Sequence, residues 1–440
     1  MHEANLKIIT ILIRFITLTC SHKELLGKFR FSDQAFIRSR KLPFEKMILL
    51  ISKLCKKSLS IELEKFFEEM GTSMLCSVSA FSQQRSKLKP EFFICANRLL
   101  QKCFYLYYGG AVKRWKGYRL IAADGSSLSL VNTPVLNHYF GGQSNQHTEF
   151  VQAKAFYHYD VLNELILLAA IKPYRYGELA MAYKAVEEIQ QDMIMIYDRY
   201  FSNYKMVALH LWQNRERKFV IRGNENQNMI KAFIQSGASS SLIEMTPTPA
   251  AIAGLKKSGF DITKDTLIQV RLVRVELPHS VEVLITNLWE EEGYHTEEFK
   301  ELYFMRWAIE TNIGIQKNIL QLESFSGLTV CSVLQDFYAT VMVVNLHSIL
   351  IKEAQQKVEH TLTERKYPVK INRNISFGKL KVNLVHLFIH HDLISVLKKL
   401  YAHFIRDVLP VRKGRSFKRI RKNPQSKSKY KTFTNFKPAY

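Results

Sequence analysis

The sequence predicts an α/β core with a β-rich insertion, preceded by an all-α N-terminal domain and followed by a helical C-terminal region and a basic tail. Residues 1–110 contain few glycines and place apolar residues at three- and four-residue steps, which is the period of a helix. From about residue 118 the period changes to two, as in strands. From residue 412 onward there are eleven Lys or Arg side chains and no acid.

These changes divide the chain into segments. We predict 1–110 as a helical DNA-binding domain, 111–224 as the first part of the α/β core, 225–289 as the β-rich insertion, 290–360 as the second part of the core, 361–411 as a helical C-terminal region and 412–440 as the basic tail.

Composition narrows the class of partner. With 440 residues, 47% of them hydrophobic, and a net charge of +24, the chain is expected to fold and to bind a polyanion such as nucleic acid. The apolar runs Leu6–Leu18 and Phe337–Ile351 are too short or too interrupted by polar residues to span a bilayer, so no membrane role is expected. The six cysteines contain no CxxC pair, which favours a reducing cytoplasm.

A helical hairpin is predicted within the N-terminal domain. Ser58–Met70 has the pattern of one helix, Gly71 breaks it, and a second helix follows that presents Gln83, Gln84 and Arg85. Such a pair is either a helix-turn-helix that reads the major groove or an ordinary helical hairpin.

The first acid of interest is Asp124, in the strand expected over residues 119–130. Its neighbours are apolar or small, and an unpaired charge there would be costly. A buried salt bridge or an Asp-Gly turn is the alternative explanation. Further strands are expected at Phe150–Tyr159 and Leu162–Ile171, followed by a helix at Gly177–Ile189.

A second acid, Asp198, ends the apolar run Met193–Tyr197, which suits a strand buried on both faces. Ligands of open α/β sheets bind at the carboxyl ends of such strands. A helix over Tyr204–Asn214 and a short strand over Lys218–Ile221 are expected next.

Three further β-like runs and two long helical stretches are expected after that. The runs are Ser241–Thr246, Leu267–Leu277 and Ser280–Leu288, and the helical stretches are Ser332–Lys352 and Leu380–Leu409.

The segment Glu297–Leu322 is expected to form one amphipathic helix. At about 100° per residue, the side chains of Tyr303, Arg306, Glu310 and Lys317 fall within an arc of roughly 60°. The opposite, apolar face would consist of Phe304, Met305, Ala308, Ile315 and Ile319. The polar stripe suits a bound polyanion, and a solvated face with weak charge pairs is the alternative.

The spacing Tyr303-x2-Arg306-x3-Glu310-x6-Lys317 resembles the Tyr-Arg-Glu-Lys signature of bacterial insertion-sequence transposases of the DDE type. The resemblance extends over about Gly117–Lys352. It implies an RNase H-like catalytic core of the retroviral integrase superfamily.

Within this resemblance, the acids Asp124, Asp198 and Glu310 match the three catalytic carboxylates that hold two Mg²⁺ or Mn²⁺ ions. Asp124 would bridge the two ions, Asp198 would hold one and Glu310 the other. Carboxylate oxygens are the ligands that such hard cations prefer.

The resemblance also implies DNA contacts. Arg306 and Lys317 would hold phosphates, Tyr303 would orient one, and Trp289 or Trp307 would stack on a flipped base. Core packing is the alternative for either tryptophan.

The activity implied is cut-and-paste DNA transposition, in which metal-dependent cleavage at the transposon ends is followed by strand transfer. The expected partners are the terminal inverted repeats and target DNA, bound by a homodimer in a synaptic complex within the bacterial cytoplasm and nucleoid. Ser79–Leu88 resembles the repeat-recognising region of the family. Two alternatives remain: a transposase-derived DNA-binding protein without activity, and another RNase H-like nuclease such as a junction resolvase.

Overall fold

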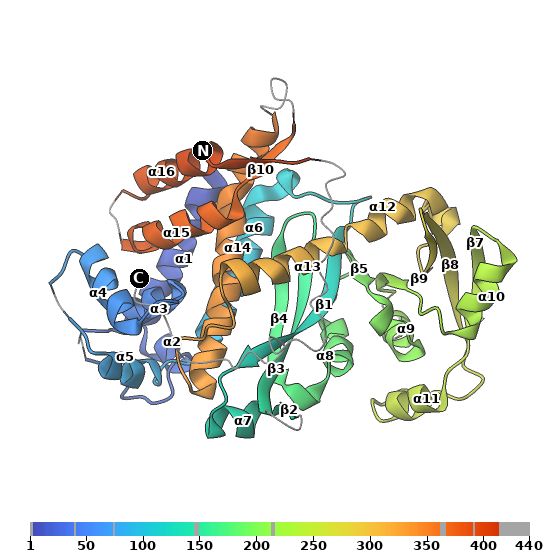
Figure 1. Ribbon diagram of the computed structural model, residues 1–440, viewed down its shortest axis with the longest axis horizontal. Coiled ribbons are helices and arrows are strands. Elements are labelled where there is room, and N and C mark those ends of the chain that lie inside the picture. The colour runs from blue at the N-terminus through green and yellow to red at the C-terminus, as the bar shows by residue number, and fades with distance from the viewer. Residues whose placement is uncertain are drawn as a thin grey trace, which may run out of the picture.

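The computed structural model describes residues 3–38, 41–73, 75–144, 149–212, 216–360, 367–389 and 392–412. Helices from both ends of the chain gather on one side of a central mixed sheet, and a smaller lobe lies on the other side (Figure 1). The chain therefore forms a mixed α/β protein with N-terminal helices, as predicted. All of the predicted basic tail except Arg412 lies outside the described residues.

The helices at the two ends of the chain share one hydrophobic core. They are α1 (Glu3–Ser21), α2 (Lys23–Lys28), α3 (Phe44–Ser52), α4 (Leu59–Glu69), α5 (Val78–Arg85), α6 (Glu91–Tyr108), α14 (Val330–His360), α15 (Arg373–Ile389) and α16 (Leu393–Arg406). Phe92 and Phe104 of α6 belong to the same core as Leu346, Leu384 and Phe404. The segments predicted as N-terminal and C-terminal regions thus pack together around α14.

The central sheet is mixed, with antiparallel strands on one side of β1 and parallel strands on the other. Its strands are β1 (Arg119–Leu130), β2 (Gly142–Ser144), β3 (Glu149–Asp160), β4 (Leu165–Pro173), β5 (Met193–Tyr197) and β6 (Lys218–Arg222), with α7 (Pro134–Phe140) after β1. β3 runs antiparallel to both β1 and β4. β5 is parallel to β1, and β6 is parallel to β5. The strands therefore lie in the order β4-β3-β1-β5-β6.

The interval between residues 225 and 289 extends this sheet. It contains β7 (Ser240–Met245), β8 (Ile268–Leu277) and β9 (Ser280–Thr286), together with α10 (Asn228–Ser236) and α11 (Pro249–Lys256). β9 pairs with β6, so within the described residues all strands from β1 to β9 form one sheet. The prediction of strands alone missed both helices, although Ile230, Phe233 and the left-handed Gly237 are a helical face and a helix end.

The two faces of the sheet are covered by different helices. Ala122 and Ile196 point to the face covered by α12 (Phe299–Phe304), α13 (Trp307–Gly314) and α14. Ala123 and Met195 point to the face covered by α8 (Glu178–Ala185), α9 (Tyr204–Leu211), α10 and α11. The alternation of side chains along each strand therefore decides which helices a residue meets.

Two helices, α1 and α14, are long and apolar enough to cross a membrane by length and composition alone. In α14, 89% of the apolar window is buried inside the protein, and in α1 the share is 39%. The apolar character of α14 is therefore accounted for by its position as a core helix.

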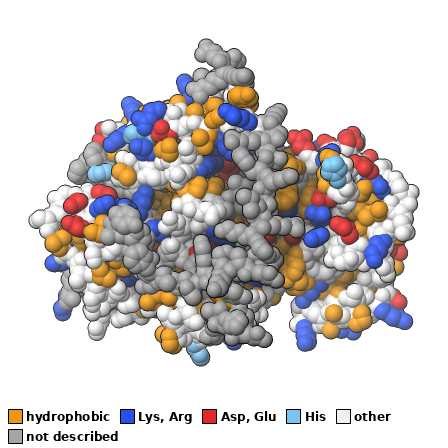
Figure 2. Space-filling model, viewed as in Figure 1, with side chains coloured by type: hydrophobic (Ala, Val, Ile, Leu, Met, Phe, Trp, Pro, Cys, Tyr) orange, Lys and Arg blue, Asp and Glu red, His pale blue; other side chains and the backbone are white. Residues whose placement is uncertain are grey.

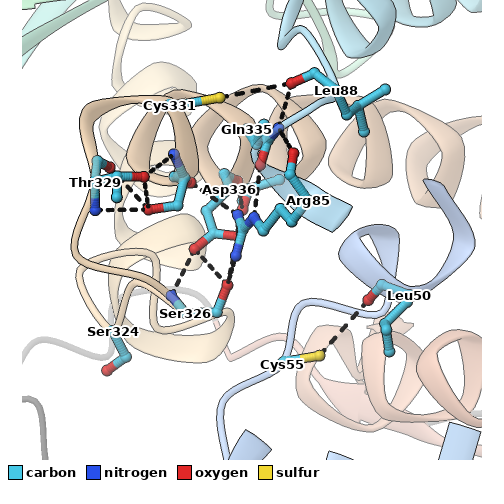
Figure 3. Close-up of polar contacts among 12 residues, drawn as sticks. Leu50, Cys55, Arg85, Leu88, Ser324, Ser326, Thr329, Cys331, Gln335 and Asp336 are labelled. Atoms are coloured by element: carbon cyan, nitrogen blue, oxygen red, sulfur yellow. Dashed lines mark hydrogen bonds and ion pairs between the residues drawn. The ribbon is translucent and has the colours of Figure 1, made fainter. Parts of the chain in front are cut away.

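Arg85, predicted as a DNA contact, is buried instead at the end of α5. Its guanidinium donates hydrogen bonds to Asp336 Oδ1 at 2.7 Å and Gln335 Oε1 at 2.6 Å (Figure 3). It also binds the hydroxyl of Ser326 and the carbonyl of Ser332. The prediction that Arg85 contacts DNA is therefore wrong. The physical reason is that the Asp336 side chain on α14 is only 7% exposed, so its carboxylate requires a buried cation as its partner.

The electrostatics of Asp336 agree with this arrangement. Burial alone would raise the pKa of Asp336, but Arg85, Lys56 and Ser326 together hold it below its ordinary value. The carboxylate is therefore charged, and Arg85 joins the N-terminal helices to the loop before α14.

Arg85→Ala should destabilise the fold by about 3–5 kcal/mol, because it leaves the Asp336 carboxylate buried without its partner. Urea unfolding of the full chain measures this loss. Lys87→Ala, an exposed cation on the same segment, is the matched control and should change stability by less than about 0.5 kcal/mol. Equal effects of the two substitutions would show that the buried pair does not hold the N-terminal helices in place.

Candidate active site

Asp124 and Asp198 lie on adjacent parallel strands. The pairing of β1 with β5 runs from Arg119 opposite Met193 to Ala122 opposite Ile196. Continued by two residues, this register brings Asp124 level with Asp198. Because side chains alternate, both acids share the face of Ala122 and Ile196, which is covered by α13.

The segment expected as one helix, Glu297–Leu322, is broken in the structure. α12 ends at Phe304, α13 begins at Trp307, and Ile315–Ile319 forms a π-helical turn. The expected apolar face is accordingly wrong at Phe304, whose side chain is 71% exposed. Tyr303 and Arg306 are buried instead, since the break turns them toward the sheet.

Glu310 and Arg306 form an ion pair on α13. The distance from Arg306 Nη2 to Glu310 Oε1 is 2.7 Å, and the side chains are 6% and 39% exposed respectively. The Arg306 guanidinium also lies 4.9 Å from the centre of the Trp307 ring. Arg306 is thus held between a carboxylate and an aromatic face.

Two buried polar atoms beside Glu310 lack a hydrogen-bond partner within the described part of the chain: the hydroxyl of Tyr303 and Nε of Arg306. Burial raises the pKa of Tyr303 to about 12, so the phenol is neutral and keeps its proton. Both donors are enclosed by the protein, so an outside acceptor could reach them only after the neighbouring side chains move.

The three acids interact electrostatically. Burial, with smaller contributions from the charges of Asp198 and Glu310, raises the pKa of Asp124 to about 7, against the opposing effects of the Gly125 amide and Arg306. Acids from two strands and a helix, far apart in sequence, are therefore close enough for their charges to interact. The structure brings the three predicted carboxylates together in this sense.

Each acid already has a local partner. Asp124 Oδ1 accepts the Gly125 amide at 2.8 Å, Asp198 Oδ1 accepts the Tyr200 amide at 2.7 Å, and Glu310 binds Arg306. Among the described residues, no three His, Cys, Asp or Glu side chains lie close enough to hold a metal ion as they stand. The donor set fits a hard divalent cation by residue type and by shared charge. Ligation by all three acids would require Glu310 to leave Arg306.

Glu178 lies close to Gly125 on the other face of the sheet. A Cβ at this position would lie 2.6 Å from Cδ of Glu178, which pairs with Lys154 at 3.1 Å. A larger residue after Asp124 would therefore require the Glu178 side chain to move. Neither Glu178 nor Lys154 belongs to a pattern that the sequence could have revealed.

Lys317 is anchored to β1, the strand of Asp124. Its Nζ donates to the carbonyl of Ser127 at 2.6 Å and lies 3.7 Å from Glu323. Glu323 in turn accepts the backbone amide of Ser129 at 2.8 Å. Glu323 was missed by sequence reasoning, because its partners on β1 are distant in sequence.

The remaining predicted DNA contacts are dispersed. Gln83 is exposed, whereas the side-chain amide of Gln84 donates to the carbonyl of Leu42. Trp307 is 46% exposed and Trp289 is half-buried. Base stacking by either tryptophan stays a prediction.

No protein-family model matches this chain, and no curated protein matches its sequence. Among solved structures, the chain is similar to piggyBac transposase in its synaptic complex with hairpin DNA. The TM-score is 0.43 with 12% sequence identity, and the match covers 91% of this chain and 85% of that chain.

The raised pKa of Asp124 predicts a pH-dependent effect of Asp124→Asn. The pKa of Asp124 is about 7 in the folded protein, against an ordinary value of 3.8. Between pH 3.8 and pH 7 the folded state therefore binds more protons than the unfolded state, so the stability of the wild type falls as the pH rises through this range. In chelator, Asp124→Asn should be more stable than wild type at pH 8, by up to about 4 kcal/mol, and the advantage should disappear near pH 4.

Urea unfolding at the two pH values measures this difference. Asp192→Asn is the contrasting control, because the pKa of Asp192 lies below its ordinary value. Burial alone would raise that pKa, but the charges and hydrogen bonds of Arg119 and Arg114 lower it by more. That variant should lose stability at pH 8. A pH-independent effect of Asp124→Asn would show that its carboxyl is not desolvated.

Proposed function

We propose that this chain is a DDE transposase, which uses divalent metal ions to cleave DNA at transposon ends and to transfer the strands by a cut-and-paste mechanism. The observation that supports this most is the position of Asp124 and Asp198 at one level of neighbouring strands, under the helix that carries Glu310. Three carboxylates whose charges oppose one another in a partly buried place need a cation to balance them.

In this proposal, the three acids keep the metal-binding roles that the resemblance implies. Asp124 would bridge two ions, Asp198 would hold one and Glu310 the other. Two bound Mg²⁺ or Mn²⁺ ions would supply an activated water or 3′-hydroxyl and stabilise the leaving oxygen of a phosphodiester.

The protein's own groups would hold the phosphate. Tyr303 OH and Arg306 Nε are buried donors without a partner in the described residues, which suits phosphate oxygens. Ligation of a cation by Glu310 would release Arg306 from its 2.7 Å contact, and the Arg306 guanidinium would then be able to bind phosphate as well. Lys317, tied to Ser127, would add a positive charge beside β1.

DNA as the partner is supported by charge. The chain carries +24 overall, and Lys and Arg side chains appear on both the helical side and the smaller lobe (Figure 2). Terminal inverted repeats and target DNA, held by a homodimer in a synaptic complex in the cytoplasm and nucleoid, complete the proposal.

One observation favours a second candidate, a transposase-derived DNA-binding protein without activity. Glu310 is engaged by Arg306, and within the described residues no ready three-ligand metal cluster is present. In such a protein the Arg306–Glu310 pair would be structural.

Glu310→Gln separates the two candidates. If Glu310 holds a metal, Mn²⁺-dependent cleavage of the element's own end DNA should fall by at least about 100-fold, as when one transition-state group is lost. DNA affinity should be retained, and stability should fall by no more than about 1 kcal/mol, since the ion pair is partly exposed.

Glu301→Gln is the matched control, because it removes the same charge from an exposed position on α12. Cleavage by Glu310→Gln at the rate of Glu301→Gln would remove Glu310 from the reaction. Absence of cleavage by wild type, with tight end binding, would support the inactive candidate.

Metal binding has a readout that needs no activity. Starting from chelator-treated protein, Mn²⁺ at 100 times its dissociation constant should stabilise wild type by about 2.7 kcal/mol. Calorimetric melting measures the shift, which should be absent in Asp124→Asn and present in Glu301→Gln. An equal shift in all three proteins would place the ion elsewhere.

A further inference from the structure

A cavity of about 360 Å³ lies on the helical side of the molecule, between segments that are distant in the sequence. Its walls come from the loop after α3, from the end of the π-helical turn at Ile315–Ile319, from α14 and from α15. The three acids, Tyr303 and Arg306 lie outside these walls. The cavity is therefore separate from the candidate active site.

Most of the accessible lining of this cavity is apolar. Leu54 and Leu380 belong to the core of the terminal helices, whereas Phe377 belongs to the core beneath the carboxylate face of the sheet. Ile319 and Leu320 are half-buried and keep accessible surface beside them. Concave apolar surface of this kind favours an apolar ligand, because burying it removes it from water.

The charged part of the lining is cationic. Four lysines contribute to it: Lys53, Lys56, Lys57 and Lys381. Within the described residues, no Asp or Glu lines the cavity. Lys53 and Lys381 are paired behind the wall, with Glu69 at 2.5 Å and Glu62 at 3.0 Å. Lys57 is half-buried and has no acidic partner in the described part of the chain, so the cavity keeps a positive excess there.

The loop that carries Lys57 is held in place from behind. Oε1 of the buried Glu62 accepts the backbone amides of Lys56 and Lys57, each at 3.1 Å. Burial alone would raise the pKa of Glu62, but Lys381 and these two amides hold it below its ordinary value. Glu62 is therefore charged and fully engaged, and it fixes the loop without facing the cavity.

Two helix ends at the cavity have an unusual backbone. Leu54 follows α3 and Gln321 follows the π-helical turn, with φ of 53° and 49°. Glycine is the usual residue in this left-handed conformation at a helix end. Both residues line the cavity. Strained backbone of this kind is frequent where a ligand is held, because the surrounding structure must keep it in place.

We propose that this cavity binds a small anionic amphiphile, a molecule with an apolar body and one carboxylate or phosphate head. The body would lie against Leu54, Leu320 and Phe377, and the head would pair with Lys57. An inorganic anion would leave the apolar lining in water, and a neutral apolar molecule would make no use of the charge. The volume lies within the range of about 300–1,000 Å³ typical of small-ligand sites.

This inference does not depend on the proposed transposase activity, since it uses no residue of the candidate active site. The ligand has two possible sources, a carboxylic acid or a phosphate ester, and both present one negative end and an apolar body.

Chain length tests the apolar part of the site. Acetate, butanoate, hexanoate and octanoate are titrated separately into the full chain in a calorimeter. Octanoate should bind with a stoichiometry of one. The affinity should rise about fourfold for each methylene that becomes buried, which is the transfer free energy of a CH₂ group expressed as a ratio. Octyl phosphate that binds more tightly than octanoate identifies a phosphate ester as the source, and the reverse order identifies a carboxylic acid.

Gly378→Leu tests the position of the site. Gly378 lines the cavity on α15, and a Cβ placed there would meet no atom within 4 Å. The variant should remain folded, because leucine favours a helix more than glycine does, and octanoate should bind at least tenfold more weakly. Gly27→Leu, at a helical glycine of α2 that also has open space around it, is the matched control and should bind as wild type does.

Lys57→Ala tests the charge. It should weaken octanoate at least fivefold and leave octan-1-ol, which carries no charge, unaffected. Lys257→Ala, an exposed lysine directly after α11, is the matched control and should change neither affinity. Melting curves establish that Lys57→Ala is folded, and Gly378→Leu decides the matter if it is not.

Three results would overturn the proposal. One is that octanoate does not bind to wild type. Another is that Gly378→Leu binds octanoate at wild-type strength, which would place the ligand elsewhere. The third is that acetate and octanoate bind equally while Lys57→Ala weakens DNA binding, which would assign this lysine to DNA phosphates.

Discussion

Burial of charge is the constraint that organises this molecule. Most buried charges here are fully paired: Arg85 with Asp336 across the N-terminal helices and α14, and Arg271 with Glu290 and the carbonyls of Leu288 and Tyr294. A buried charge without a partner costs several kcal/mol, so such pairs decide which elements must meet. Arg85 is the clearest case, because it fixes α5 to the loop before α14.

The group around Asp124 departs from this rule. Its carboxyl is partly buried beside two other acids, while Tyr303 and Arg306 keep donors without partners in the described chain. Buried atoms without partners also occur elsewhere in the described residues, for example at Ser52 and Gln316. The deficit therefore marks a candidate site only together with the three neighbouring acids.

Strand β1 connects these features. It pairs with β3 and β5, carries Asp124, and offers the Ser127 carbonyl to Lys317 and the Ser129 amide to Glu323. The segment after α13 is therefore tied to the strand of the first acid at two points. The π-helical turn at Ile315–Ile319 contains Lys317 and lies between Glu310 and Glu323, and such turns are frequent at functional sites.

The sequence by itself determined the order and kind of the core elements. Period-two and continuous apolar runs identified β1, β3, β4, β5 and β6, because strand burial leaves a local pattern. It also singled out Asp124 as an acid within an apolar strand, Asp198 at a strand end, and Glu310 through the spacing of the residues around it. Only the tertiary structure decided what depends on contacts between distant segments.

Among those contacts, the register of β1 and β5 places Asp124 and Asp198 at the same height along the two strands. The pairing of β9 with β6 joins the insertion to the central sheet. Arg85 is buried because the Asp336 carboxylate needs a cation as its partner, although the pattern of its own helix predicts an exposed residue. The break near Met305 exposed Phe304 and buried Tyr303, against helical arithmetic. The periodicity of a sequence shows only which side of a helix or strand is apolar. The residues that pack against that side, and the charges that they carry, come from segments that can lie hundreds of positions away.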